Sequence, residues 1–223
     1  MTRHSFLILA TLLTHLVALG QNLKTCSCAK NEFAGTKANT TFQFTNGKAI
    51  ALCGYKNLGS KPTMFSEFVL SVCSSNRIID FWPATLTCRL RTDKDTLFVE
   101  QIEKLPTGKN FKYQPTIWSV EKIYFKGQHV KRKLAVNRKI RKYNSSEIKT
   151  ILQSFKTAKV ELNDEVMELG NKLFISAISG DKTARQYFKE FRTHFGVLDG
   201  AFKEEYDDLV AKLELWEKKN SSL

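Results

Sequence analysis

The sequence predicts an α+β fold, with an N-terminal antiparallel all-β domain, either a sandwich or a barrel, followed by a C-terminal antiparallel bundle of about four short helices. From Thr40 to about Lys142, apolar residues recur with the period of two that is typical of half-buried strands. From Ser145 onward they recur with the period of a helix, and the connections are short. We therefore divide the chain into a signal peptide (1–20), an N-terminal arm (21–39), a basic β domain (40–143) and a helical domain (144–223).

The first twenty residues have the organisation of a cleaved secretory signal. Arg3 supplies a basic head, an apolar run extends from Phe6 to Leu19, and the small residue Gly20 precedes Gln21. An uncleaved transmembrane anchor is the alternative, but this run is shorter than the roughly 20 apolar residues that a bilayer span needs. We expect cleavage near Gly20 and a secreted, periplasmic or extracellular product, with no transmembrane segment after it.

Seven or eight strands are expected in the β domain. Asn46-Gly47 supplies the positive φ angles of a tight turn and predicts a hairpin around it. The segment 84–92 alternates cleanly and predicts a half-buried strand with Cys88 in the core, followed by the polar turn TDKD and a return strand at 96–103. In that alternation, Leu86, Cys88 and Leu90 share the buried face, and Thr85, Thr87, Arg89 and Arg91 share the other. Further strands are expected at 66–73, 77–82, 116–125 and 130–136.

Four amphipathic helices are expected after Asn144. In the first, Ile148, Ile151, Leu152 and Phe155 form one apolar stripe behind an N-terminal cap formed by Ser145 and Glu147. Asn163 can cap a second helix that ends at Gly180. Asp181 can start a third that ends at Gly196, and a fourth begins near Gly200.

Five cysteines in an exported chain favour disulfide bonds. Cys26 and Cys28 alternate along an extended segment, so they are poor partners for each other and good partners for two other cysteines. Cys53 and Cys73, each at the end of a predicted strand, are the natural mates, and the pairing among these four stays open. Cys88 is then the buried free thiol. We expect no metal and no cofactor, because no second close Cys or His pair exists and a redox pair would need two intervening residues.

The Cys-x-Cys near the mature N-terminus, followed by a small β domain, resembles the netrin-like fold of tissue metalloproteinase inhibitors. In those inhibitors the first cysteine is itself the mature N-terminus and chelates the metal of the target. Here Cys26 lies five residues beyond Gln21. The resemblance covers one tripeptide and implies no such inhibition.

The excess positive charge of the chain lies entirely in its first half. Residues 21–144 carry 22 Lys and Arg against 8 Asp and Glu, whereas residues 145–223 carry 12 against 14. Such asymmetry favours an anionic polymer or an acidic protein as the partner of the β domain, by long-range attraction. No dedicated nucleic-acid motif is present, and the oligomeric state is not predicted.

A run from Lys122 to Lys142 is the candidate contact surface, because it contains nine basic residues and no acid. It can bind phosphates, sulfated or uronic glycans or an acidic protein, with Tyr124, Phe125 and Tyr143 available for stacking. The alternative is that these charges form the solvated face of an edge strand and prevent aggregation. Trp82, beside Pro83, is a possible aromatic platform for a sugar ring or a protein. The basic residues are Lys122, Lys126, Lys131, Arg132, Lys133, Arg138, Lys139, Arg141 and Lys142.

The function we favour is that of an exported two-domain binding or structural protein whose basic β domain contacts an anionic partner. No nucleophile elbow, phosphate-binding loop or His-Glu-x-x-His motif is present, so we expect no enzyme. One alternative is an exported hydrolase with dispersed carboxylates, for which Asp80, Glu100 and Glu121 are the strand-associated acids. Another is an accessory or inhibitor protein that docks through the helical bundle.

Overall fold

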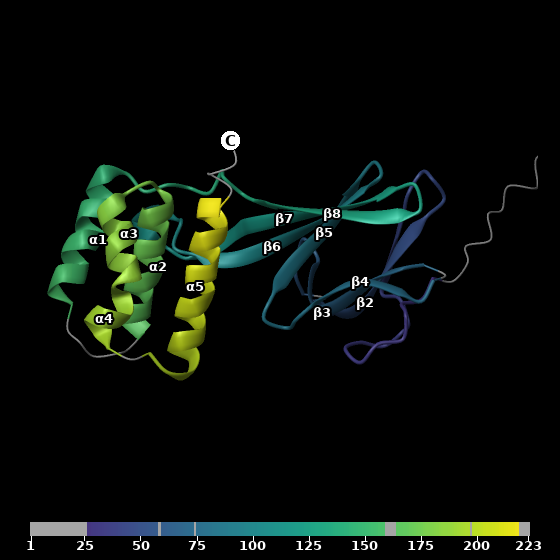
Figure 1. Ribbon diagram of the computed structural model, residues 1–223, viewed down its shortest axis with the longest axis horizontal. Coiled ribbons are helices and arrows are strands. Elements are labelled where there is room, and N and C mark those ends of the chain that lie inside the picture. Colours follow the sequence, from purple (N-terminus) through teal and green to yellow (C-terminus); the bar gives the residue numbers. More distant parts are fainter. Residues whose placement is uncertain (1–25, 58, 74, 159–163, 197, 219–223) are drawn as a thin grey trace, which may run out of the picture.

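The computed structural model describes residues 26–57, 59–73, 75–158, 164–196 and 198–218. The predicted signal peptide and the predicted cap Asn163 lie outside these residues. Eight strands in the described chain precede five helices, which gives the predicted α+β order (Figure 1). The strands are β1 (Thr40–Gln43), β2 (Ala49–Asn57), β3 (Met64–Val72), β4 (Arg77–Trp82), β5 (Thr87–Asp93), β6 (Thr96–Leu105), β7 (Gln114–Lys126) and β8 (His129–Val136).

All eight strands belong to one antiparallel sheet. Its order is β1-β2-β3-β5-β6-β7-β8, with β4 paired to β3 beside this path. Over the described residues β1 pairs only with β2, and β8 pairs only with β7, so backbone pairing does not close the sheet into a barrel. A short 3₁₀ turn, Lys109–Phe111, lies in the connection between β6 and β7.

Two tight hairpins confirm the turn predictions. In the first, the Phe44 amide donates to the Lys48 carbonyl at 2.9 Å, and Gly47 adopts the positive φ of 75° that the turn requires. In the second, β5 and β6 are joined through Lys94 and Asp95, with Asp93 opposite Thr96. This second turn fixes the register of the two strands.

Side chains connect parts of the curved sheet that backbone pairing leaves apart. At the first hairpin, the Phe44 ring packs edge-on against Phe125 with ring centroids 5.4 Å apart, and the Thr45 amide donates to Asp95 at 2.6 Å. Lys48 also donates from Nζ to the Gly127 carbonyl in the turn between β7 and β8. The turns at this end of the sheet are therefore tied together.

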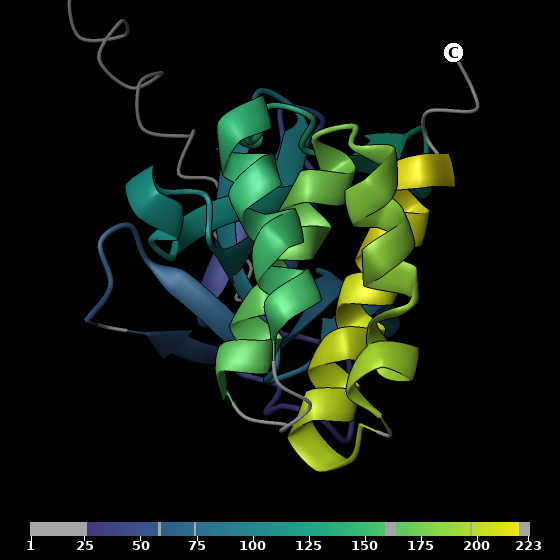
Figure 2. The ribbon, with the colours of Figure 1, turned by 90° about the vertical axis from the view of Figure 1, so that its left-hand side faces the viewer.

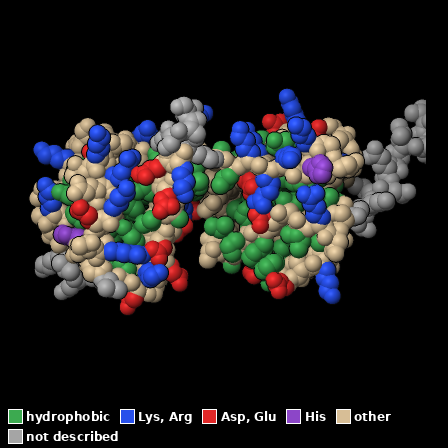
Figure 3. All heavy atoms as spheres, viewed as in Figure 1, with side chains coloured by type: hydrophobic (Ala, Val, Ile, Leu, Met, Phe, Trp, Pro, Cys, Tyr) green, Lys and Arg blue, Asp and Glu red, His purple; other side chains and the backbone are tan. Residues whose placement is uncertain are grey.

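The interior of the curved sheet is an apolar core. Fully buried residues from several strands meet there, and Phe68 stacks on Trp82 with centroids 4.9 Å apart. The predicted free thiol, Cys88, is buried in this core. On the face drawn in Figure 3, apolar side chains gather over β3 and β4.

The helical part contains α1 (Ser145–Thr157), α2 (Asp164–Ile178), α3 (Lys182–Lys189), α4 (Phe191–Phe195) and α5 (Gly200–Lys218). The cap of α1 is Asn144 and not Ser145, because Asn144 accepts from the Glu147 amide while the Glu147 carboxylate accepts from the Asn144 amide. Asp181 caps α3 as predicted, and Gly196 ends α4 with a φ of 86°. The predicted third helix is broken at Glu190 into α3 and α4.

A second core joins the helices to the ends of three strands. Trp118 of β7 is 2% exposed and lies between Phe174 of α2 and Trp216 of α5, with centroid distances of 5.6 and 6.1 Å. Leu105 and Val136, at the end of β6 and of β8, belong to the same cluster. Figure 2 shows the helices seen from their own side, in front of the sheet. The bundle is therefore packed against one end of the sheet by large buried side chains.

Two disulfides attach the N-terminal segment to the sheet. Cys26 is bonded to Cys73, and Cys28 to Cys53, so the four predicted cysteines are the bonded ones. The Ala29 amide also donates to the Ser71 hydroxyl at 3.2 Å. These bonds are consistent with an oxidising, extracellular location.

Candidate functional site

The predicted basic run divides into residues on the β7–β8 ribbon and residues on the connection to α1. In the ribbon, Lys122 lies opposite Lys133, Tyr124 opposite Lys131, and Lys126 opposite His129. Cross-strand partners share a face of a sheet, as do alternate residues of one strand. Four lysines therefore lie on one face of the ribbon, and we call Lys122, Lys126, Lys131 and Lys133 the lysine face.

The lysine face is exposed and carries uncompensated charge. None of its four ammonium groups makes an ion pair within the described part of the chain. Lys122 and Lys133 face each other directly, and like charges in this position destabilise a sheet. Tyr124 lies between them and Lys126, 37% exposed. In Figure 3, lysine and arginine side chains gather over this ribbon.

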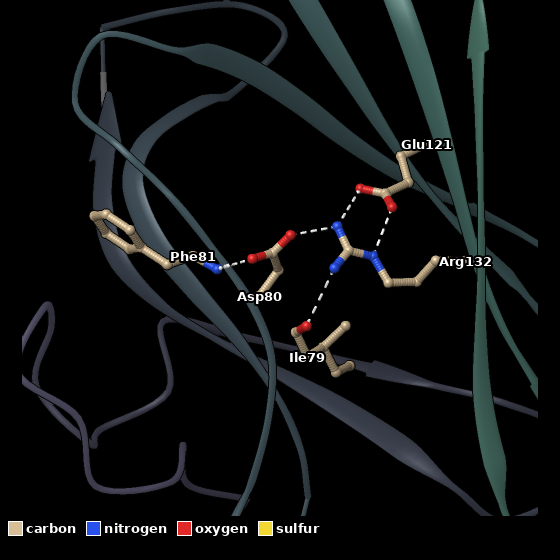
Figure 4. Close-up of polar contacts among 5 residues, drawn as sticks. All are labelled: Ile79, Asp80, Phe81, Glu121 and Arg132. Carbon is tan, nitrogen blue, oxygen red and sulfur yellow. Dashed lines mark hydrogen bonds and ion pairs between the residues drawn. The ribbon is translucent and has the colours of Figure 1, made fainter.

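Arg132 belongs to the other face of the ribbon. Its Nε donates to Glu121 at 2.6 Å, its Nη2 donates to Glu121 and Asp80, and its Nη1 donates to the Ile79 carbonyl at 3.3 Å (Figure 4). Hydrogen bonding to Glu121 and to Asp80 outweighs partial burial and raises the pKa of Arg132. Arg132 therefore connects β8 to β4 and is not available to a partner.

The connection between β8 and α1 contains two further arginines with internal partners. Arg138 donates to the Trp216 carbonyl at 2.6 Å and lies 4.1 Å from the centroid of that ring. Arg141 pairs with Glu147 at 2.5 Å, which connects it to the cap of α1. Lys139 and Lys142 are exposed and make no ion pair among the described residues. Of the nine predicted cations, the three arginines thus have structural contacts.

Two arginines outside the predicted run belong to the same surface. Arg89 and Arg91 of β5 donate from Nε to the two oxygens of Glu100, at 2.6 and 2.8 Å. We call Arg89 and Arg91 the arginine pair. Glu100 itself is 3% exposed. Across the sheet, Arg91 lies opposite Phe98, Phe98 opposite Lys122, and Lys122 opposite Lys133.

The arginine pair was missed as a site, although the sequence carried a signal for it. Alternation along 84–92 places Arg89 and Arg91 on one face, which the structure bears out. The two-residue turn at Lys94 and Asp95 then sets Arg89 opposite Glu100. The register of β5 against β6, inferred from that turn, would have predicted that Arg89 and Arg91 lie close to Glu100.

The three carboxylates of the hydrolase alternative do not form an unpaired catalytic dyad. Asp80 and Glu121 converge, but on the guanidinium of Arg132 (Figure 4). Burial acts to raise the pKa of Glu100, yet hydrogen bonds and charge from Arg91 and Arg89 outweigh it, so this pKa lies below its usual value. A general acid needs a raised pKa, and Glu100 has the opposite shift.

Trp82 does not present a ring face to solvent. It is 8% exposed, it stacks on Phe68, and the guanidinium carbon of Arg132 lies 5.7 Å from its ring centroid. The predicted aromatic platform is therefore part of the core in this structure.

The surroundings of the Cys88 thiol make it a poor nucleophile. Burial, with smaller contributions from Glu103 and Glu121, raises the pKa of Cys88 to about 12. The thiolate is the nucleophilic form, so this cysteine does not supply one near neutral pH.

Two kinds of site are not found in the described chain. No group of three or more His, Cys, Asp or Glu side chains there is placed to hold a metal ion. The described helices also include none that combines the length and apolar character needed to cross a bilayer.

No protein-family model, curated protein or solved structure matches the chain. The lysine face and the arginine pair are therefore the surfaces from which a function can be inferred.

Proposed function

We propose that this chain is an exported binding protein that holds an extended anionic polymer on the lysine face. The observation that carries the proposal is the set of four lysines on one exposed face without an acidic partner among the described residues. The arginines of the same run, by contrast, are all engaged internally. Lys122 lies 5.6 Å from the centroid of the Phe98 ring, and none of the four lysines has an ion pair among the described residues, so their charges are available to an anionic partner.

Protection of the edge strand β8 against aggregation explains only part of the lysine face. It explains Lys131 and Lys133 on β8, the edge strand, because charged side chains there oppose sheet-to-sheet pairing. It does not explain Lys122, which lies on β7 between two paired strands and directly opposite Lys133. A bound polyanion would remove the repulsion between these two lysines.

The chemistry of the face suits a polymer such as a sulfated or uronic glycan. Lysine acts as a flexible point charge, which favours contact with a repeating anion over recognition of one fixed group. Alternate lysines on a strand are about 6.6 Å apart, so several can contact one extended chain. Tyr124, in their midst, can stack on a sugar ring. The two disulfides fit an exported protein of this kind.

Docking through the helical bundle receives less support. The large apolar side chains with high exposure in the described chain are Phe33, Tyr55, Ile78, Tyr124 and Leu134, and all lie before the first helix. An exposed apolar stripe on a helix would have favoured that alternative.

Retention on immobilised heparin tests the proposal. The test variant replaces Lys122, Lys126, Lys131 and Lys133 by Gln, and the control replaces four exposed helical lysines, Lys149, Lys156, Lys182 and Lys189, by Gln. We expect the test variant to elute at much lower salt and the control to elute near the wild-type position. The slope of log affinity against log salt should fall by about one for each lysine removed from the contact. Equal losses in both variants would show that only net charge matters and would refute the site.

A further inference from the structure

The arginine pair lies on the outer face of the sheet, beside the lysine face. Leu97 and Val99 of β6 are buried in the apolar core of the sheet, so Phe98, between them, points to the opposite face. Cross-strand partners share a face, and the register sets Phe98 between Arg91 of β5 and Lys122 of β7. The cations of both groups therefore belong to one surface.

One row of side chains crosses four strands on this surface. Arg91, Phe98, Lys122 and Lys133 follow one another across β5, β6, β7 and β8, and we call them the cross-strand row. The guanidinium carbon of Arg91 lies 4.0 Å from the Phe98 ring centroid, and Nζ of Lys122 lies 5.6 Å from it. Neighbouring strands are about 4.8 Å apart, so the row spans about 14 Å. Adjacent side chains thus connect the lysine face to the arginine pair.

Positive charge on this surface ends along the strands but continues across them. The next residue on the same face is Val120 after Lys122 in β7, and Ala135 after Lys133 in β8. Neither residue carries a charge. Across the strands, by contrast, the arginine pair follows Phe98. An extended polyanion that lay only along the β7–β8 ribbon would not contact the arginine pair.

The surface stays positive after its acids are counted. Its cations are the four of the lysine face and the two of the arginine pair. The acids that the register places on it are Glu100, which accepts from Nε of both arginines, and Asp93, at the turn into β6. Six cations against two acids leave four positive charges. The η nitrogens of the arginine pair have no hydrogen-bond partner within the described part of the chain, so these donors remain for a ligand.

We propose that the bound polyanion, a sulfated or uronic glycan, crosses the strands along the cross-strand row, from the lysine face over Phe98 to the arginine pair. There one sulfate or carboxylate group accepts hydrogen bonds from the η nitrogens. The planar fork of an arginine matches two oxygens of such a group, whereas a lysine offers a point charge. Glu100 already holds both guanidinium groups, so they lose little freedom on binding. This inference rests on the proposed function and adds to it the path of the polymer and a fixed anchor.

Retention on immobilised heparin tests this path with a matched pair of variants. In both variants, two cations and the carboxylate that they share are replaced by Gln, so each variant loses one net positive charge. The test variant changes Arg89, Arg91 and Glu100. The control changes three residues of the helical domain, Arg192, Lys203 and Asp207. Circular dichroism confirms that each variant is folded.

We expect the test variant to elute from heparin at lower salt than the wild type, and the control to elute near the wild-type position. The slope of log affinity against log salt should fall by about one in the test variant, because one net charge leaves the contact. Equal elution of the test variant and its control would overturn the path across the strands.

Chemical protection tests the path in the wild-type protein, without a substitution. An arginine-selective dicarbonyl reagent modifies accessible guanidinium groups, and mass spectrometry identifies the modified residues. The side chains of Arg89, Arg91 and Arg192 are 33%, 47% and 43% exposed, so Arg192 is a suitable internal reference. Bound heparin should slow the modification of Arg89 and Arg91 severalfold and leave that of Arg192 unchanged. Unchanged reactivity of the arginine pair would overturn the proposal.

The Gln variant of the lysine face separates failure of this inference from failure of the proposed function. If that variant elutes early while the arginine variant elutes with its control, the polymer stays on the ribbon; this inference is then wrong and the proposed function stands. If the lysine-face variant elutes with its own control, the proposed function fails, and the path, which begins at the lysine face, fails with it. Early elution of both variants supports both proposals.

Discussion

Replacing both Arg89 and Arg91 by Gln should leave Glu100 as a buried carboxylate without a cation. Glu100 is 3% exposed, and its two oxygens accept from the two arginines at 2.6 and 2.8 Å. Removing the partners of a buried charge costs about 3–5 kcal/mol. The arginine side chains are 33% and 47% exposed, so solvent screens part of this interaction. We therefore expect the double variant to lose about 3 kcal/mol of its free energy of unfolding, at the lower end of that range.

Neutralising Glu100 as well should recover part of the loss. In the triple variant, with Glu100→Gln added, no charge is buried, and a buried group without a partner costs about 1–3 kcal/mol. Set against a loss of about 3 kcal/mol in the double variant, this makes the triple variant more stable than the double variant by up to about 2 kcal/mol at pH 7. The free energy of unfolding is measured by urea denaturation, followed by far-ultraviolet circular dichroism.

The pH dependence of the contribution of Glu100 to the free energy of unfolding should change sign between the wild type and the double variant. In the wild type the pKa of Glu100 is lowered, so its stabilising contribution is present at neutral pH and is lost as the pH falls through the folded pKa. In the double variant burial acts alone and raises that pKa, so protonation relieves the buried charge as the pH falls toward about 4. The difference in free energy of unfolding between the wild type and the double variant should therefore become smaller from pH 7 to pH 5.

Either of two results would refute this reasoning. One is a double variant within 0.5 kcal/mol or so of wild-type stability at pH 7, which would be the range of an ordinary surface substitution. The other is a gap that widens toward pH 5 while the triple variant behaves as the double variant does.

Two further predictions concern the cores. Trp118→Ala should lower the free energy of unfolding by about 3–5 kcal/mol, because Trp118 packs between Phe174 and Trp216. For the same reason the strand and helix signals should be lost in one urea transition. Separate transitions for strands and helices would contradict the packing of the helices on the sheet. Cys88 should not react with a thiol reagent in the native protein at pH 8 and should react after unfolding in urea, because burial raises its pKa to about 12; rapid labelling of the folded chain would contradict its burial.

Local patterns were enough to predict much of the fold. Alternation in 84–92 placed Cys88 in the core, and Asn46-Gly47 identified a hairpin, because both depend on residues close together in sequence. Asp181 and Gly196 marked a helix start and a helix end for the same reason. The break at Glu190 was not predicted, and we have no physical account of it from the helix alone.

The surface was predicted less well than the elements. A run of basic residues in the sequence contains both free and engaged cations, and only the register separates Lys122, Lys131 and Lys133 from Arg132. The partners of Arg132 lie on β4 and β7, and that of Arg138 on α5, far along the chain. Such contacts between distant segments leave no local pattern.

The sequence by itself determined the α+β order, the strand and helix periods, the four bonded cysteines as a set, and the excess of positive charge in the first half. These follow from backbone geometry and composition, which act locally. Tertiary structure alone decided which cysteines pair, that Trp82 is buried, and that Arg89 and Arg91 meet over Glu100. Each of these depends on how the strands curve and pack, because distant residues meet only when the whole sheet has formed.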